Sequence, residues 1–195
     1  MAPEGAKPTS KSKILPRVDC EHEGILLPLD CSFYQVKTPM EILRCPPRIS
    51  SPLGLANPKD ASDKWLTTSL KLNNNSIEDL DDLPRAIGGL FPSENWLTWL
   101  DLSCNLLPRV PPELLQLTNL KILYLHSNRI KTTKELIKLQ PLQNLTKLTA
   151  HGNPAELEPG YFVTVLSVLP NLLKLDFTGI SLNERLAASR VRQAS

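Results

Sequence analysis

Leu123-Tyr124-Leu125-His126-Ser127-Asn128 is one of four short segments of this chain that share the pattern L-x-[L/A]-x-x-N. The other three occupy residues 70–75, 100–105 and 148–153. Their final asparagines stand at positions 75, 105, 128 and 153, so successive copies are 30, 23 and 25 residues apart. This pattern and spacing are typical of leucine-rich repeats, in which each repeat forms one coil of a solenoid.

The longer template L-x-x-L-x-L-x-x-N-x-L predicts which side chains fill the coils. Its inward positions are held by Thr67, Leu70, Leu72, Ile77, Leu97, Leu100, Leu102, Leu107, Leu120, Leu123, Leu125, Ile130, Leu145, Leu148, Ala150 and Ala155. A fifth strand at 172–177 keeps the alternation through Phe177, but Ile180 stands where the asparagine would be. We predict an α/β solenoid: a leucine-rich-repeat horseshoe of about five coils with a concave parallel sheet, a helical C-terminal cap and an extended N-terminal arm.

The chain divides by composition into four parts. Residues 1–60 hold nine of the 18 prolines and also apolar groups, which predicts an extended arm that orders on a partner or on its own repeats. An ordinary disordered tail is the alternative for this arm. The repeats span 65–155, the cap with its apolar helix spans 156–182, and 183–195 form a polar tail.

The four repeated asparagines have a structural role in this prediction. Each one stands where the chain leaves a strand and turns, and a buried backbone there would lack hydrogen-bond partners. A side-chain amide can both donate to and accept from the main chain of the adjacent coil. Asn75, Asn105, Asn128 and Asn153 are therefore expected to form a polar ladder rather than to bind a ligand.

The outward strand positions provide the candidate binding site. Side chains at equal positions of successive coils become lateral neighbours on the concave face, because parallel strands lie about 4.8 Å apart. The candidate partner-binding residues are Lys71, Trp99, Asp101, Ile122, Tyr124, His126, Lys147, Thr149, His151, Lys174 and Asp176. Trp99, Ile122 and Tyr124 form a patch of the kind found at interface hot spots. The alternative is that the arm or a long loop of the same chain covers this patch.

Several function classes lack a signal in the sequence. The chain has no nucleophile elbow, P-loop, H-E-x-x-H motif or phosphate-binding glycine loop, so we expect no enzyme, cofactor or small-molecule substrate. His126 and His151 are lateral neighbours, but no third ligand accompanies them and no metal site is expected. The net charge of +2 does not predict a nucleic-acid or membrane partner.

The compartment is indicated by the termini and the cysteines. No apolar run approaches the roughly 18 residues of a membrane span, and residues 1–7 have no apolar signal-peptide core. The cysteines, at 20, 31, 45 and 104, contain no C-x-x-C pair and no disulfide-closed cap flanks the repeats. Reduced thiols in a cytoplasmic protein are the expectation.

The end of the array resembles a known family. The strings Gly152-Asn-Pro154, Gly160-Tyr161, Leu169-Pro-Asn-Leu172 and Leu175-Asp176 are similar to the C-terminal cap of short intracellular leucine-rich-repeat proteins. That group includes the axonemal dynein leucine-rich light chain, a regulatory subunit of protein phosphatase and the spliceosomal U2 A-prime protein. A common form of this cap has arginine after its tyrosine, where this chain has Phe162.

More narrowly, residues 65–180 resemble the leucine-rich repeat-containing protein 51 family. The strings that carry this likeness are Leu72-Asn-Asn-Asn75, Leu97-Thr-Trp-Leu-Asp-Leu-Ser103, Leu123-Tyr-Leu-His-Ser-Asn128, His151-Gly-Asn-Pro154 and Asp176-Phe-Thr-Gly179. The resemblance implies a non-enzymatic cytoplasmic scaffold in a multi-protein assembly, with a cilium or flagellum axoneme as the leading location. A phosphatase regulatory subunit and a ribonucleoprotein adaptor are the alternatives; Lys7, Lys11, Lys13 and Arg17 with three C-terminal arginines give the adaptor slight support.

Overall fold

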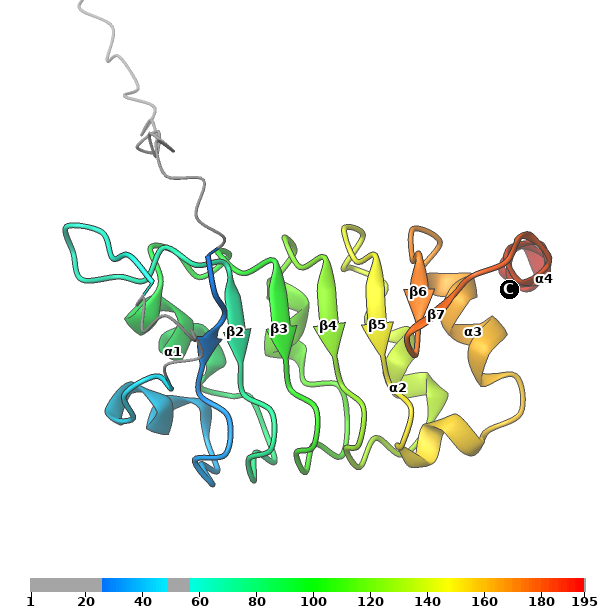
Figure 1. The fold of residues 1–195 in the computed structure, drawn as a ribbon. Coiled ribbons are helices and arrows are strands. Elements are labelled where there is room, and N and C mark those ends of the chain that lie inside the picture. The colour runs from blue at the N-terminus through cyan, green and yellow to red at the C-terminus, as the bar shows by residue number, and fades with distance from the viewer. Residues whose placement is uncertain (1–25, 49–56, 195) are drawn as a thin grey trace, which may run out of the picture.

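The computed structural model describes residues 26–48 and 57–194, and its architecture is a leucine-rich-repeat solenoid (Figure 1). One sheet of seven strands runs through it in chain order. The strands are β1 (Leu29–Asp30), β2 (Ser69–Lys71), β3 (Trp99–Asp101), β4 (Ile122–Tyr124), β5 (Lys147–Thr149), β6 (Lys174–Leu175) and β7 (Thr178–Gly179). Neighbours pair in parallel from β1 to β6, and only β7 runs antiparallel, to β6.

The limbs that connect the strands are helical. They contain α1 (Leu83–Leu90), α2 (Thr133–Ile137) and α3 (Tyr161–Val168), together with the 3-10 helices Pro39–Arg44, Pro112–Gln116 and Pro154–Leu157. Each 3-10 helix begins at a proline, whose fixed φ suits a first helical turn and whose missing N–H is not needed there. No helix among the described residues is both long and apolar enough to cross a membrane.

The core lies between the sheet and these limbs. Each of the inward template positions, from Thr67 to Ala155, is at most 1% exposed. Burial at this level removes each leucine side chain almost completely from water, which favours the folded state by roughly 1.5–3 kcal/mol per side chain. The inward positions predicted from the repeat template are therefore confirmed. The alternating side chains of each strand lie on the other, outward face of the sheet.

A left-handed residue ends each strand segment. Phe33, Asn74, Cys104, Ser127 and Gly152 occupy equivalent places in successive coils, and their φ angles lie between 53° and 68°. This conformation turns the chain sharply into the next limb. Asparagine and glycine adopt it at little cost, whereas Phe33, Cys104 and Ser127 accept some strain.

The N-terminal arm is in part an additional coil. Leu29 and Asp30 pair with Leu70 and Lys71, and Leu29, Cys31, Val36 and Ile42 are all at most 3% exposed. Residues 26–48 thus pack on the chain's own first repeat. Residues 1–25 and 49–56 of the expected arm lie outside the described residues.

The C-terminal end differs from the expectation in two ways. Residues 183–195 were expected to be a polar tail, but helix α4 (Leu182–Ala194) includes nearly all of them. Ala188 is buried against the rest of the cap, and Arg185 donates to the carbonyls of Pro170 and Leu172. The expected inward position of Phe177 is wrong. Asp176 and Phe177 both have positive φ, the chain reverses into β7, and the Phe177 ring is 59% exposed.

Candidate protein-binding face

Two rows of side chains cross the outward face of the sheet. The strand register places Ser69, Trp99, Ile122, Lys147 and Lys174 side by side in one row. The second row runs through Asp30, Lys71, Asp101, Tyr124 and Thr149. The pairing predicted from the repeat spacing is thus present, and an apolar stretch stands in the middle of the first row with two lysines at its C-terminal end.

Five rings form a continuous cluster on this face. Trp99 and Tyr124 meet edge to face with centroids 6.0 Å apart, and Phe177 meets Tyr124 at 5.5 Å. Phe177 also lies 5.8 Å from both His126 and His151, whose rings are stacked with centroids 4.8 Å apart. Such ring pairs contribute about 0.5–1.5 kcal/mol each beyond their buried area. The cluster, named here the ring patch, joins strands β3 and β4 to the C-terminal cap.

The rings are supported from below but remain accessible. Trp99, Tyr124, His126 and His151 are half-buried, and Phe177 is the most exposed of the five. Desolvation, and then the negative charge of Asp101, raise the pKa of the Tyr124 hydroxyl. Trp99 Nε1 is shielded from solvent and has no hydrogen-bond partner among the described residues. The ring patch is therefore an apolar surface held in a fixed orientation.

Two of the candidate residues are committed to internal contacts. Asp101 is 8% exposed and its Oδ1 accepts from the N–H and the hydroxyl of Ser103, at 3.0 and 2.6 Å. Thr149 is 1% exposed, and its hydroxyl lies 2.8 Å from His126 Nδ1. These two side chains position the strand ends and the ring patch. Because they are buried, a partner would contact the more exposed residues beside them.

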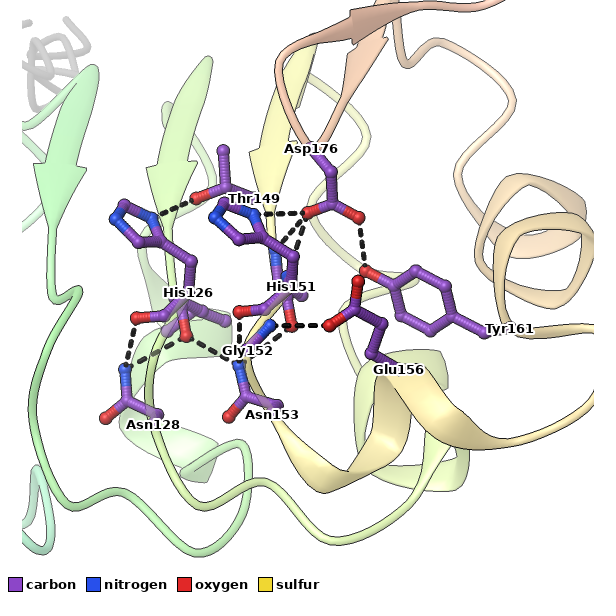
Figure 2. A network of polar contacts seen from close by, with 11 residues as sticks. His126, Asn128, Thr149, His151, Gly152, Asn153, Glu156, Tyr161 and Asp176 are labelled. Atoms are coloured by element: carbon purple, nitrogen blue, oxygen red, sulfur yellow. Dashed lines mark hydrogen bonds and ion pairs between the residues drawn. The ribbon is translucent and has the colours of Figure 1, made fainter.

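The carboxylate of Asp176, which lies between β6 and β7, binds the residues that follow β5 (Figure 2). Its Oδ1 accepts from the backbone N–H of Ala150 and His151, at 2.7 and 2.9 Å, and its Oδ2 accepts from the Tyr161 hydroxyl at 2.7 Å. In the preceding coils, the N–H of the residue equivalent to Ala150 donates to a backbone carbonyl of the next coil. Leu125, for example, donates to the Thr149 carbonyl. For Ala150, the Asp176 carboxylate takes the place of that backbone carbonyl, because no further regular coil follows.

Glu156 has a similar role at the turn that follows. Its Oε2 accepts from the Gly152 N–H at 2.7 Å, whereas the preceding coil has a bond from the Ser127 N–H to the His151 carbonyl. The two carboxylates therefore satisfy donors that another coil would otherwise satisfy. Asp176 stays a candidate partner contact, and its carboxylate also makes these internal hydrogen bonds.

The stacked histidines have defined partners on one ring nitrogen each. His126 Nδ1 faces the Thr149 hydroxyl, and His151 Nδ1 lies 3.2 Å from Asp176 Oδ1 (Figure 2). Desolvation, and then the nearby His151, lower the pKa of His126 below its ordinary value of 6.5. Across residues 26–48 and 57–194, no three His, Cys, Asp or Glu side chains gather in a way that could hold a metal ion.

The charged candidates differ in their pairing. Lys71 Nζ lies 3.0 Å from Asp30 Oδ2, so the N-terminal end of the face carries a paired charge. Lys147 and Lys174 are register neighbours on β5 and β6, and neither makes an ion pair with a described residue. The accessible charge at the C-terminal end of the face is therefore positive.

The asparagines line the turn edge of the sheet rather than the candidate face. Asn128 Nδ2 donates to the carbonyls of Leu102 and Leu125 at 2.9 Å, and its Oδ1 accepts from the Leu107 N–H at 3.1 Å. Asn105 and Asn153 repeat this arrangement in their own coils. Asn75 begins the ladder and accepts from the N–H groups of Tyr34 and Val36 in the first coil.

Two features of the face have only weak sequence signals. Phe177 joins the ring patch because the chain reverses after β6, and the missing asparagine at position 180 was the only indication that the regular coil ends there. The first coil, Leu29-Asp-Cys-Ser-Phe-Tyr-Gln-Val36, follows the strand template with cysteine at one apolar position and tyrosine in place of asparagine. A search that allowed these two exchanges would have found it.

The solenoid fold is that of a leucine-rich-repeat protein, and the family described as "Leucine rich repeat" matches residues 96–154. Leucine-rich repeat-containing protein 51 of Bos taurus is 41% identical over 162 residues, which cover 83% of this chain and 82% of that protein. The chain belongs to the leucine-rich repeat-containing protein 51 family.

Two further similarities point to another repeat protein. A probable U2 small nuclear ribonucleoprotein A' of Caenorhabditis elegans is 29% identical over 123 residues, which cover 63% of this chain and 46% of that protein. The crystal structure of the Drosophila melanogaster SNF/U2A' complex matches with a TM-score of 0.59 and 23% identity, over 83% of this chain and 78% of that chain. At this identity the structural likeness shows the shared fold.

Proposed function

We propose that this chain is a non-enzymatic binding scaffold that holds another protein on the outward face of its sheet. The observation that carries the proposal is the ring patch: Trp99, Tyr124 and Phe177 are fixed against one another and remain reachable from solvent. Aromatic side chains of this kind dominate the binding energy of many protein interfaces. The leucine-rich-repeat family, whose members present extended binding surfaces, supports the same reading.

The proposal is tested by affinity purification from cells that express the tagged chain. The variant Trp99→Ala/Tyr124→Ala removes the centre of the ring patch, and Lys131→Glu/Lys134→Glu changes two exposed residues that lie on the limb after β4. We expect the aromatic variant to lose co-purified proteins that the lysine variant retains. If both variants recover the wild-type set of proteins, the outward face is not the binding site.

We further propose that the assembly in question belongs to a cilium or flagellum. The support is the likeness of the cap to that of axonemal leucine-rich light chains. In this proposal the chain is a structural component of an axonemal complex and is a cytoplasmic protein before assembly. The chain should then remain with axonemes that have been washed in high salt. A chain that is freely soluble in ciliated cells contradicts this location.

A ribonucleoprotein adaptor is the second candidate, favoured by the similarity to the U2 small nuclear ribonucleoprotein A' of C. elegans. It requires association with RNA, directly or through an RNA-binding protein. Loss of co-purified proteins after ribonuclease treatment would favour the adaptor over the axonemal component. A phosphatase regulatory subunit is a third candidate, and it requires phosphatase activity that co-purifies with the wild type and is lost with Trp99→Ala/Tyr124→Ala.

A further inference from the structure

The charges on the outward face are distributed unevenly. At the N-terminal end Lys71 is paired with Asp30, and in the middle Asp101 is buried and held by Ser103. At the C-terminal end Asp176 has a 17% exposed side chain and is used by four donors from Ala150, His151 and Tyr161. The carboxylates of this face are therefore already occupied within the chain.

The lysines at the C-terminal end have no such partners. Lys147 and Lys174 are direct register neighbours, so their Cα atoms lie about 4.8 Å apart across the parallel pair β5–β6. Lys121 is exposed and directly precedes β4, so it adds a third positive charge near the N-terminal ends of the strands, where Lys147 and Lys174 begin β5 and β6. None of the three makes an ion pair with any residue in the described ranges. Like charges placed directly opposite each other in a sheet are destabilising, so a negative group bound beside these lysines would relieve their repulsion.

The ring patch lies beside these lysines. Ile122 is the register neighbour of Lys147, and Phe177 follows Lys174 by three residues while its ring contacts Tyr124. An occupant of the face can therefore contact both the apolar surface of rings and the unpaired ammonium groups of neighbouring strands. The two stacked histidines add no negative charge to this end.

From this arrangement we infer that the occupant is a protein segment that combines an apolar or aromatic anchor with acidic side chains. The anchor packs on Trp99, Tyr124 and Phe177, and the carboxylates of the segment lie over Lys147 and Lys174. This inference rests on the proposed function and adds the chemistry of the partner to it. Rings that already contact one another edge to face are better suited to side-chain anchors than to a run of stacked nucleobases.

The orientation of the segment also follows from the face. Trp99 and Ile122 lie on β3 and β4, whereas Lys147 and Lys174 lie on β5 and β6, so a segment that contacts both pairs must run across the strands. Its acidic part lies toward the C-terminal cap. Because the complementary charges are near the surface, they contribute mainly to the association rate and to the discrimination between partners.

The test uses an unbiased phage-displayed library of random peptides, panned on the full chain at low salt. The most enriched peptide is then synthesised with a fluorescein label, and its dissociation constant is measured by fluorescence anisotropy. We expect enriched peptides with net negative charge and at least one large apolar residue. Lys147→Glu/Lys174→Glu should raise the dissociation constant of the labelled peptide by about tenfold or more, which is a change of about 1.4 kcal/mol in the binding free energy. The matched control Lys131→Glu/Lys134→Glu, with the same change in net charge, should alter it by less than about twofold.

Other outcomes overturn the inference in distinguishable ways. Neutral or basic peptides that are lost with Trp99→Ala/Tyr124→Ala refute the acidic partner and leave the proposed function intact. Peptides that bind that aromatic variant normally refute both. Enrichment of no peptide also overturns the inference. An oligouridylate probe that displaces the peptide and binds more tightly, with the same dependence on the two lysines, replaces the acidic segment by RNA.

Discussion

The Tyr161 hydroxyl donates to Asp176 Oδ2 at 2.7 Å and thereby connects helix α3 to the turn between β6 and β7. Burial, and then the charge of Asp176, raise the pKa of Tyr161 well above its ordinary value of 10.0, so the hydroxyl remains a donor. The other oxygen of Asp176 accepts from the N–H groups of Ala150 and His151, the two residues that follow β5. One side chain thus completes the hydrogen bonds of the last regular strand and fixes the cap that carries Phe177.

Asp176→Ala should destabilise the chain by more than Asp176→Asn. The alanine variant leaves the N–H groups of Ala150 and His151 without their acceptor, and each unsatisfied buried group costs about 1–3 kcal/mol. The asparagine variant keeps an oxygen at the same place. Urea unfolding followed by circular dichroism measures both losses. Equal losses for the two variants would contradict the role given to the carboxylate oxygen.

Asn128→Ala should reduce the free energy of unfolding by at least about 2 kcal/mol. The substitution removes the bonds to the carbonyls of Leu102 and Leu125, a longer one to the His126 carbonyl and the bond from the Leu107 N–H. Asn128 is 6% exposed, so buried backbone groups lose their partners. Asn144→Ala is the control, because Asn144 is exposed and its amide donates a single bond to the Thr118 carbonyl. The control should lose less than about 1 kcal/mol. A ladder without structural importance would give the two variants the same midpoint in urea.

Leu29→Ala should cost about 2–5 kcal/mol if residues 26–48 form a packed coil. Leu29 is 1% exposed and pairs with Leu70 through β1 and β2, so truncation opens a cavity at the N-terminal end of the core. Leu43→Ala provides the comparison, since Leu43 lies in the same segment but is 39% exposed. A loss for Leu29→Ala no greater than for Leu43→Ala would show that this coil is detached in solution.

His126 should make the stability depend on pH in the mildly acidic range. Its pKa in the folded chain is lowered, chiefly by desolvation, so the folded state binds a proton less readily than the unfolded state. The contribution to stability is complete above the ordinary value of 6.5 and is lost as the pH falls through that value toward the lowered pKa. Relative to His126→Gln, the wild type should therefore lose unfolding free energy between about pH 7.5 and about pH 5. A difference between wild type and variant that is constant over this range would refute the assignment.

The repeated part of the fold is the part that sequence alone predicts well. The spacing of leucines and asparagines gives the inward positions, the parallel register and the ladder, because each is repeated and each follows from the same local geometry. The outward rows follow directly from that register, which is why Trp99, Ile122 and Tyr124 could be placed together.

The ends of the array are less predictable because their solutions are not repeated. The first coil uses Cys31 and Tyr34 in place of the usual residue types, so its apolar pattern was read as an arm. At the other end, the carboxylate of Asp176 takes the place of a backbone carbonyl, and Phe177 turns outward when the strand reverses. The large apolar residues of helix α4, Leu182, Leu186 and Val191, are exposed. The packing of this helix depends on Ala188 and on the bonds from Arg185 to the carbonyls of Pro170 and Leu172.

Site-specific photo-cross-linking from the face tests the central claim most directly. A photoreactive amino acid at position 122 sits in the row between Trp99 and Lys147, and the same residue at exposed position 134 serves as the control. Irradiation of cells that contain the native assembly should give a covalent adduct with a partner polypeptide from position 122 and none from position 134. Adducts that form equally from both positions, or only from position 134, would contradict a partner bound on the outward face.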